Sequence, residues 1–391
     1  MCKDSAFFRN FVAVKKKKTI MYRLLRYFLL STLLVPATIL AQPLRVGVML
    51  PLHNDNGDGR RMVEYYRGLL MGCDSLKKNG MSINIHAWNV AENADIQQTL
   101  ADPDAAKCDL IIGPLYSKQV KALSEFVEKH NIKLLIPFSI HTSELQRNGN
   151  IYQVYQDPAT FNESVIARFM QNFKEYHPVI IDCKDSTSTK GAFTGSLRRH
   201  LEATGINHHI TNIKSTEDVF QNAFSQTQPN VVILNTSRLQ ELGVVFAKLN
   251  SLKVQKPDLE LTVFGYTEWL GYTRNQLENF YKFNVHIPSP YYYNPLTSRT
   301  QRVQQKYRWN FHQDMMQTQP RFAITGFDHA LFFIQGLKLR GKRFTGEYGS
   351  IVCNPIQTPL QFSRIGNGGW QNHSLVFVHY TPEHRIETLQ Y

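Results

Sequence analysis

The sequence predicts an α/β protein made of two doubly wound parallel-sheet lobes that are joined by a multi-strand hinge. Two successive series of short apolar runs alternate with helical patterns, and each series holds about four strands. About 350 residues follow the N-terminal segment, which is more than one hydrophobic core usually holds. A tail of helices and a hairpin then departs from this alternation, so we expect the chain to return to both lobes. Several crossings between lobes form a hinge with a cleft beside it.

The first lobe is predicted from four apolar runs. Each run is too short for a helix and ends at a proline, a glycine or a polar loop. Between the runs, apolar residues at helical spacing predict a first helix that Gly80 closes and a second one interrupted near Pro103. The expected strands are 45–52, 83–88, 109–112 and 134–139.

The third of these strands organises the first lobe. Leu110 to Ile112 is followed directly by Gly113 and Pro114, as expected of a buried parallel strand that ends in a tight turn. Ser117 stands where the N-cap of the next helix is expected. Such turns lie at the carboxyl ends of parallel strands, where open α/β sheets bind ligands, and helix amides there favour an anion. The alternative is that Gly113 and Pro114 only make the turn and Ser117 only caps.

The second lobe repeats the alternation, and the tail follows it. Apolar runs at 179–182, 209–211, 231–234, 261–265 and 285–287 predict its strands. Two helices are expected in the tail, and then a hairpin that pairs 360–363 with 375–378 across the turn Gly366 to Gly369. The expected division is a signal region at 1–41, a first lobe of 42–154 with 290–343, and a second lobe of 155–289 with 344–391.

The N-terminus has the layout of a secretory signal. A basic segment at 21–26 precedes a mostly apolar stretch at 27–35, and Ala41 is a suitable small residue for cleavage. The apolar stretch is too short to span a bilayer comfortably, so we expect no transmembrane segment in the mature chain.

The whole chain has a formal charge of +13, but residues 1–41 hold eight of the 44 basic and one of the 31 acidic residues, which leaves +6. That balance, with no clustered stripe, argues against a nucleic-acid partner.

Four cysteines lie beyond the signal region, and their spacing fits no zinc site. In an oxidising compartment one disulfide is plausible, with Cys73 and Cys108 as the pair, and buried free thiols are the equal alternative.

The loop 54–59 partly resembles a calcium loop, but Tyr65 stands where its bidentate Glu would be, so a flexible loop at the cleft edge is favoured. We expect no metal and no cofactor. The sequence has no nucleophile elbow, zinc-protease motif or P-loop, so we expect no enzyme activity.

Aromatic residues in two loops are candidates for ligand contact. Trp269 next to Glu268 suits a cationic or sugar-like ligand, and a packed Trp with an exposed Glu is an equal alternative. The run Tyr291 to Tyr293 follows an expected crossover, where packing in the hinge is favoured over stacking on a ligand.

Several motifs in order resemble the type I periplasmic binding fold of the leucine/isoleucine/valine-binding protein family and of relatives associated with LysM modules. They are RVGVMLPL at 45–52, DLIIGPLYSKQV at 109–120, LLIPFS at 134–139, FGYTEWLGY at 264–272, ITGFDHALFFIQGLKLRG at 324–341 and LQFSRIGNGGWQN at 360–372. The resemblance covers nearly all of 44–391. It implies a ligand site built from loops of both lobes. The matching residues are Gly113, Pro114, Tyr116 and Ser117 for a ligand carboxylate, Ser139, His141 and Thr142 for its completion, and Thr267 and Glu268 for a ligand ammonium.

The resemblance implies a periplasmic protein that captures a small anionic or zwitterionic ligand by hinge closure, for ABC-type uptake or for sensing. The expected partners are that ligand and an ABC permease or a cell-wall enzyme. The family's Tyr-Gly after the first strand of the second lobe is replaced here by 185–191, DSTSTKG, which weakens the case for an amino acid. The alternative is a non-catalytic module of the cell envelope with a degenerate cleft, which regulates peptidoglycan synthesis by contact.

Overall fold

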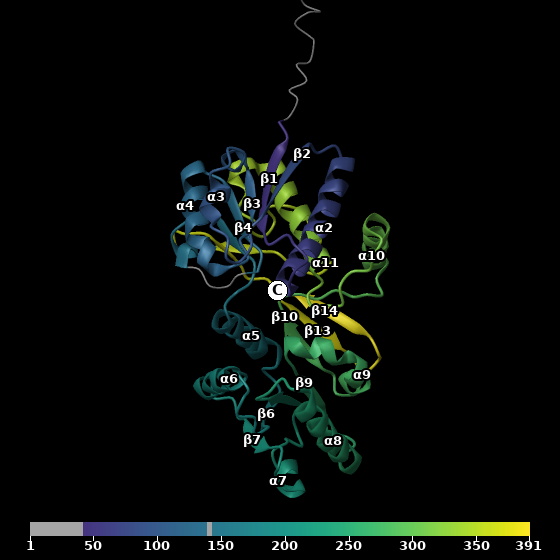
Figure 1. Ribbon diagram of the computed structural model, residues 1–391. Helices are drawn as coiled ribbons and strands as arrows, with labels where there is room; N and C mark the ends of the chain where they lie inside the picture. The colour runs from purple at the N-terminus through teal and green to yellow at the C-terminus, as the bar shows by residue number, and fades with distance from the viewer. Residues whose placement is uncertain (1–41, 139–142) are drawn as a thin grey trace, which may run out of the picture. The chain divides into compact units, whose positions relative to one another are not determined.

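A computed structural model describes residues 42–138 and 143–391 of the chain (Figure 1). The signal region at 1–41 and the candidate ligand residues Ser139, His141 and Thr142 lie outside the described residues. No helix in the described ranges is long and apolar enough to cross a membrane.

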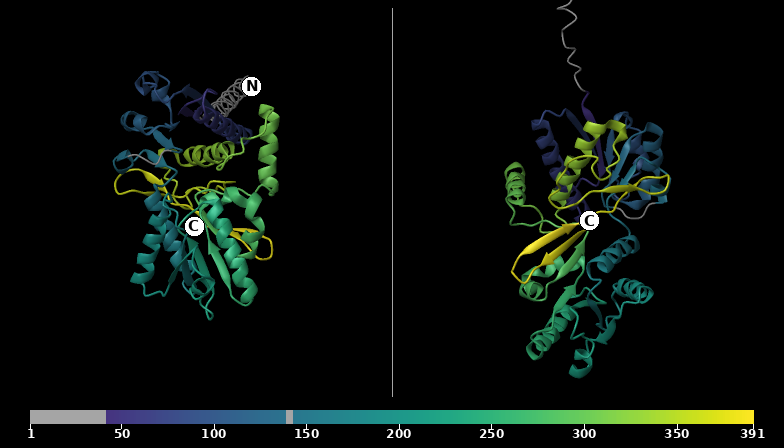
Figure 2. Two further views of the ribbon diagram at one scale, coloured as in Figure 1. Left: turned by 60° about the horizontal axis from the view of Figure 1, so that its bottom comes forward. Right: turned by 180° about the vertical axis from the view of Figure 1, so that it is seen from behind.

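The structure contains two seven-stranded sheets, which confirms the predicted α/β class with two largely parallel sheets (Figures 1 and 2). The first sheet has the order β11 (Phe362–Arg364), β12 (Trp370–Asn372), β5 (Ile151–Gln153), β4 (Lys133–Ile136), β3 (Leu110–Ile112), β1 (Leu44–Leu50) and β2 (Ile83–Asn89). The second has the order β14 (Ile386–Gln390), β13 (Val376–Tyr380), β10 (His286–Ser289), β9 (Leu261–Phe264), β8 (Asn230–Leu234), β6 (His177–Asp182) and β7 (His209–Asn212). We call the parts built on these sheets the first and second lobes.

Helices cover the faces of both sheets (Figure 1). The first lobe holds α2 (Gly57–Lys78), α3 (Ile96–Leu100), α4 (Val120–His130), α11 (Phe322–His329), the π-helical turn η5 (Ala330–Ile334) and α12 (Gln335–Arg340), and α10 (Ser298–Phe311) packs on it. The second lobe holds α5 (Pro158–Asn172), α6 (Gly191–Ala203), α7 (Glu217–Gln221), α8 (Leu239–Gln255) and α9 (Thr273–Lys282).

Alternation along β1 separates the core of the first lobe into two layers. Val46 and Val48 point into the cluster that contains Cys73 of α2, whereas Met49 points into the cluster that contains Cys108. Successive side chains of a strand face opposite sides of a sheet, so the two thiols lie on opposite faces. Of the two equal alternatives, the Cys73–Cys108 disulfide is therefore wrong and free thiols are correct, because the four described cysteines are unpaired.

Glycines allow α2 and α11 to cross at close range. A Cβ on Gly68 would lie 1.8 Å from the carbonyl oxygen of Ala323, and one on Gly326 would lie 2.0 Å from that of Tyr65. Only residues without a Cβ fit at these two positions. This crossing fixes the position of α11, and with it Asp328, relative to α2.

The C-terminal strands pair differently from the expected hairpin. β11 pairs antiparallel with β12, and β12 pairs parallel with β5 in the first sheet. β13 pairs with β10 and with β14 in the second sheet. The turn at Gly366 to Gly369 is local to β11 and β12, so the expected pairing of 360–363 with 375–378 is wrong. The segment 362–372 lies in the first sheet, and not with the second lobe as the division at 344–391 assumed.

The buried carboxylate of Asp328 fixes the position of residues 355–358, which precede β11. Asp328, at the end of α11, has no exposed surface and accepts hydrogen bonds from three successive backbone amides, those of Ile356 (2.8 Å), Gln357 (2.8 Å) and Thr358 (3.0 Å). Burial raises the pKa of Asp328 to about 6, and the three amides act in the opposite direction. We call residues 355–358 the strap.

The strap also holds the connection that leaves β10. The carbonyl oxygen of Gln357 accepts from the amide of Tyr292 at 2.9 Å, and the Gln357 side chain binds the backbone amide of Arg321 (2.9 Å) and the hydroxyl of Thr325 (2.7 Å). The Arg321 guanidinium in turn donates to the hydroxyl of Tyr293 at 2.7 Å. The strap and the connection from β10 to α10 are thus tied to α11 by buried hydrogen bonds.

We expect Asp328→Asn to lower the free energy of unfolding by about 2–4 kcal/mol, because the amide leaves at least one buried N–H of the strap without an acceptor. Urea unfolding at neutral pH measures the change. Asp314→Asn is the control, since that side chain is 68% exposed and should change stability by less than about 0.5 kcal/mol. A small effect at Asp328 would show that the strap does not depend on its carboxylate.

A second prediction concerns pH. His286 of β10 stacks on His379 of β13 with ring centroids 3.9 Å apart. Burial, and secondarily His379, lower the pKa of His286 to about 3. A histidine kept neutral in the folded state stabilises fully above its unfolded pKa, and this contribution is lost as the pH falls below about 6.5. Lowering the pH from 7 to 5 should therefore remove about 2 kcal/mol of stability through His286.

Urea unfolding of His286→Phe at both pH values tests this prediction. Phe keeps an aromatic ring in the stack but does not titrate, so the variant should lose less stability than the parent on acidification. His384→Asn changes an exposed histidine and serves as the control. An unchanged pH slope in His286→Phe would contradict the prediction.

Candidate functional site

The turn after β3 is shaped by close approach of the backbone. Gly113 has φ +134°, and a Cβ there would lie 2.1 Å from the carbonyl oxygen of Met49. Its amide donates to the carbonyl oxygen of Leu135 at 2.9 Å, which extends the ladder between β3 and β4. The glycine is therefore required by the turn, and its amide is already bonded within the sheet.

Ser117 does not occupy the cap position that the sequence predicted. It is the first residue of the 3-10 helix η2 (Ser117–Gln119), with Tyr116 at the cap, and α4 begins only at Val120. An extra turn of 3-10 helix thus separates the strand from α4.

Tyr116 connects this turn to the start of α2. Its hydroxyl donates to Asp58 at 3.3 Å, and Asp58 also pairs with Arg61 at 2.6 Å. Asn56 caps α2 through the Gly59 amide at 2.7 Å, so the loop 54–59 has a helix-capping role. The described residues hold no group of three or more side chains that could bind a metal ion.

A cavity of about 240 Å³ lies where the β5–α5 connection meets the carboxyl ends of β9 and β10. We call it the Lys190 cavity. It includes the predicted residues Thr267 and Glu268, whereas Gly113, Pro114, Tyr116 and Ser117 are not among its lining residues. Its polar side chains are those of Gln156, Asn162, Lys190, Thr267, Glu268 and the hydroxyls of Tyr155 and Tyr266.

Glu268 forms an ion pair within the second lobe. The Lys190 ammonium lies 2.7 Å from a Glu268 carboxylate oxygen and 4.9 Å from the centre of the Tyr266 ring. The Lys190 side chain is 23% exposed and the Glu268 side chain 47%. The predicted acceptor for a ligand ammonium is thus paired with a cation of the chain itself, and both charges remain accessible from the cavity.

Tyr155 contributes a buried polar atom to the Lys190 cavity. Its hydroxyl is buried and has no hydrogen-bond partner among the described residues, although the ring packs against Phe138 and Tyr291. A buried hydroxyl without a partner costs free energy in the unliganded protein. The Thr267 hydroxyl, in contrast, donates to the carbonyl oxygen of Pro288 at 2.9 Å and so has a structural bond.

The aromatic candidates mostly pack inside the protein. Trp269 has no exposed surface and stacks on Phe280, and a Cβ on Gly265 would lie 2.3 Å from its ring. The alternative of a packed Trp beside an exposed Glu is therefore the correct one. Tyr291 contacts Tyr155, and Tyr293 accepts from Arg321, as expected for packing in the hinge.

Several lining residues of the Lys190 cavity were not predicted, and Lys190 and Tyr155 are the two on which the site depends most. Lys190 lies just before α6, in the segment that departs from the family pattern. The only indication of its role in the sequence is a positive charge beside the glycine that begins a helix. Tyr155 lies two residues after the end of β5, and nothing in the neighbouring sequence distinguishes it from other aromatic residues of the hinge.

The fold defines the class: the chain has the type I periplasmic binding protein fold. No protein-family model matches the chain. No curated protein matches it either.

Among solved structures, the chain is similar to a putative branched-chain amino acid ABC transporter from Rhodospirillum rubrum, with 13% identity over 89% of this chain and 100% of that one and a TM-score of 0.55. It is also similar to a branched-chain amino acid ABC transporter periplasmic ligand-binding protein from Burkholderia xenovorans, with 11% identity, coverage of 88% and 94%, and a TM-score of 0.52. A third match is the C-domain of LpoA from Haemophilus influenzae, described as a regulator of PBP1A, with 14% identity, coverage of 88% and 99%, and a TM-score of 0.53. At these identities the similarity establishes the fold.

The Tyr155 hydroxyl gives a direct test of the site. We expect Tyr155→Phe to raise the free energy of unfolding by about 1 kcal/mol, because it removes a buried group that lacks a partner. Tyr266→Phe is the matched control, since the Tyr266 hydroxyl donates to the carbonyl oxygen of Leu234 and its loss should destabilise by about 1 kcal/mol. Chemical unfolding measures both, and destabilisation by Tyr155→Phe would show that its hydroxyl has a structural partner.

Proposed function

We propose that this chain is a non-enzymatic binding protein that captures a small anionic or zwitterionic ligand by hinge closure. The observation that carries this proposal is the Lys190 cavity, where an accessible pair of opposite charges and a partnerless buried hydroxyl converge at the hinge of a binding-protein fold. Ligand sites of this kind combine apolar walls with a few well-placed polar groups.

In this proposal the two residues of the ion pair bind different groups of the ligand. Lys190 receives a carboxylate, the Glu268 oxygen that faces away from Lys190 receives an ammonium or hydroxyl donor, and Tyr155 donates its hydroxyl. The first lobe closes over the ligand with Gly113, Pro114, Tyr116 and Ser117 and with Ser139, His141 and Thr142. The ligand shifts the open–closed population only by its greater affinity for the closed form.

We place this activity outside the cytoplasmic membrane, following the signal-like segment at 1–41 and the fold. The binding-protein neighbours belong to ABC transporters of branched-chain amino acids by their descriptions, which supports delivery to an ABC permease or a sensing role. The segment 185–191 differs from the amino-acid binders, so small peptides and wall fragments join amino acids as candidate ligands.

A second candidate function is a cell-envelope interaction module that regulates a wall synthase by contact. It is favoured by two observations on the predicted ligand groups: Glu268 is paired with Lys190, and the Gly113 amide is bonded to Leu135. Similarity to the LpoA C-domain supports the same alternative.

Calorimetric titration with amino acids, small peptides and wall fragments tests the first proposal. We expect a ligand of micromolar affinity whose binding is weakened at least about tenfold by Glu268→Gln, because one charge-assisted hydrogen bond is lost. Tyr155→Phe should weaken binding while it stabilises the fold. Glu260→Gln, on an exposed acid of the same lobe, should leave affinity unchanged. If no small molecule binds and the chain instead captures a purified wall synthase, the second function replaces the first.

A further inference from the structure

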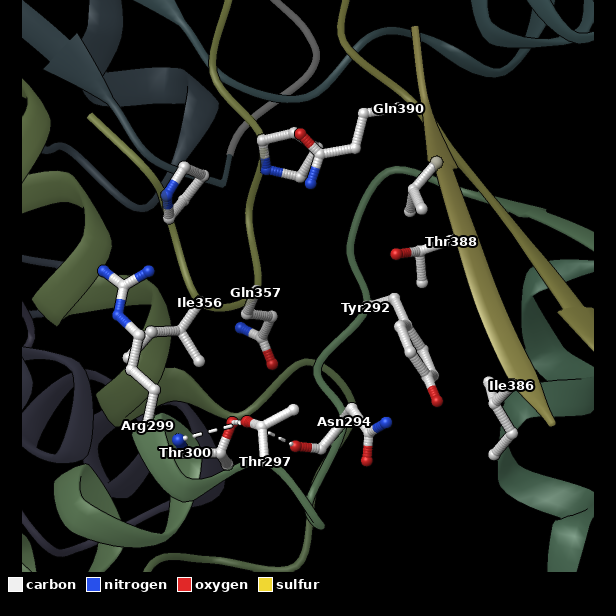
Figure 3. A pocket seen from close by; sticks show the side chains of 13 residues that line it. Tyr292, Asn294, Thr297, Arg299, Thr300, Ile356, Gln357, Ile386, Thr388 and Gln390 are labelled. Atoms are coloured by element: carbon white, nitrogen blue, oxygen red, sulfur yellow. Dashed lines mark hydrogen bonds between the residues drawn. The ribbon is translucent and has the colours of Figure 1, made fainter. Parts of the chain in front are cut away.

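A second cavity, of about 280 Å³, lies beside the strap and shares no lining residue with the Lys190 cavity. We call it the Arg299 cavity. Figure 3 shows Arg299 of α10 beside Ile356 on one wall, with Tyr292, Thr388 and Ile386 on the opposite wall. The first wall belongs to α10 and the strap, whereas Thr388 and Ile386 belong to β14 of the second sheet.

Arg299 brings a positive charge to this cavity. The guanidinium forms no hydrogen bond or ion pair within 42–138 and 143–391, and no aspartate or glutamate lines the cavity. Asp328 attracts Arg299 electrostatically but forms no ion pair with it, because its two carboxylate oxygens accept the three amides of the strap. An arginine that is only partly exposed and has no partner is suited to an anionic ligand.

The rest of the lining limits the kind of anion. The other polar groups around the cavity, such as Asn294, Thr388 and the Tyr292 hydroxyl, are neutral, so a single negative charge is matched. Ile356, Ile386 and the Tyr292 ring supply an apolar wall that a bare inorganic ion would leave uncovered. A small organic monocarboxylate with an apolar body satisfies both parts.

We propose that the Arg299 cavity is a binding site for a small amphipathic monocarboxylate and that occupancy of this site biases the opening of the two lobes. The ligand carboxylate pairs with the Arg299 guanidinium, and its apolar body lies between Ile356 and Ile386. Because these isoleucines belong to elements of different lobes, the fit of the ligand depends on the lobe angle. Differential affinity of this kind is what shifts a hinge equilibrium. The site is separate from the cleft and does not rest on the ligand proposed there.

Methyl NMR of the full chain with 3-phenylpropionate as the probe tests the site. We expect saturable shifts of the Ile356 and Ile386 methyl groups, and a dissociation constant at least about tenfold weaker in Arg299→Gln, from loss of one charged hydrogen-bonding partner. The neutral analogue 3-phenylpropanol should bind more weakly, and Arg299→Gln should not affect it. Arg302→Gln, on the exposed face of the same helix, is the matched control and should behave as the parent. Absence of shifts at millimolar probe, or equal affinity in Arg299→Gln, would overturn the assignment.

A measurement of the distance between the lobes tests whether occupancy of the Arg299 cavity changes their opening. Spin labels on Lys121→Cys in the first lobe and Glu202→Cys in the second occupy exposed helix positions and report the separation of the lobes. Saturating 3-phenylpropionate should change their distance distribution in the parent and not in Arg299→Gln. Methyl shifts without a change in distance would overturn the coupling.

Discussion

The Asp328 carboxylate, which accepts the amides of Ile356, Gln357 and Thr358, is the interaction on which the arrangement of the hinge depends. The carboxylate belongs to α11, and α11 is held against α2 by the contact of Gly68 and Gly326 with opposing backbone. Three amides bonded to one side chain fix the strap in both position and register. The strap then positions Tyr292 through the carbonyl oxygen of Gln357. A single buried group thereby connects the core of the first lobe to the chain segment that arrives from β10 of the second.

The two cavities lie on different parts of this framework and differ in their charges. The Lys190 cavity contains a positive and a negative side chain that neutralise one another, so a ligand that enters must exchange an existing ion pair for new partners. Such an exchange gives little net affinity unless the ligand offers both charges or additional hydrogen bonds. The Arg299 cavity is lined by one cation, Arg299, and by no carboxylate, so an anion entering it breaks no ion pair of the lining. These differences explain why we assign a zwitterionic ligand to one and a monocarboxylate to the other.

Local patterns in the sequence predicted most of the strands and helices. The features that they did not predict depend on contacts between residues that are distant in the sequence. Buried strands such as Leu110–Ile112 and the turn at Gly113 follow from apolar runs and glycine, which act over a few neighbouring residues. The pairing of β11 with β12 was missed because β12 reads Trp-Gln-Asn, with a single apolar residue, whereas Leu375 to Val378 is a continuous apolar run. Burial of Trp269 under Gly265 and the ion pair of Lys190 with Glu268 depend on the folded path of the chain. No periodicity encodes such contacts, so the sequence singled out Thr267 and Glu268 but not the cation that pairs with Glu268.

Amide hydrogen exchange at the strap measures the central constraint most directly. The amides of Ile356, Gln357 and Thr358 lie outside the regular strands, and amides in irregular segments commonly exchange quickly. If Asp328 holds the strap as described, these three amides exchange as slowly as those in the central strands of the first sheet, and together become fast in Asp328→Asn. Exchange of the three amides at the rate of an unprotected loop in the parent protein would contradict the account.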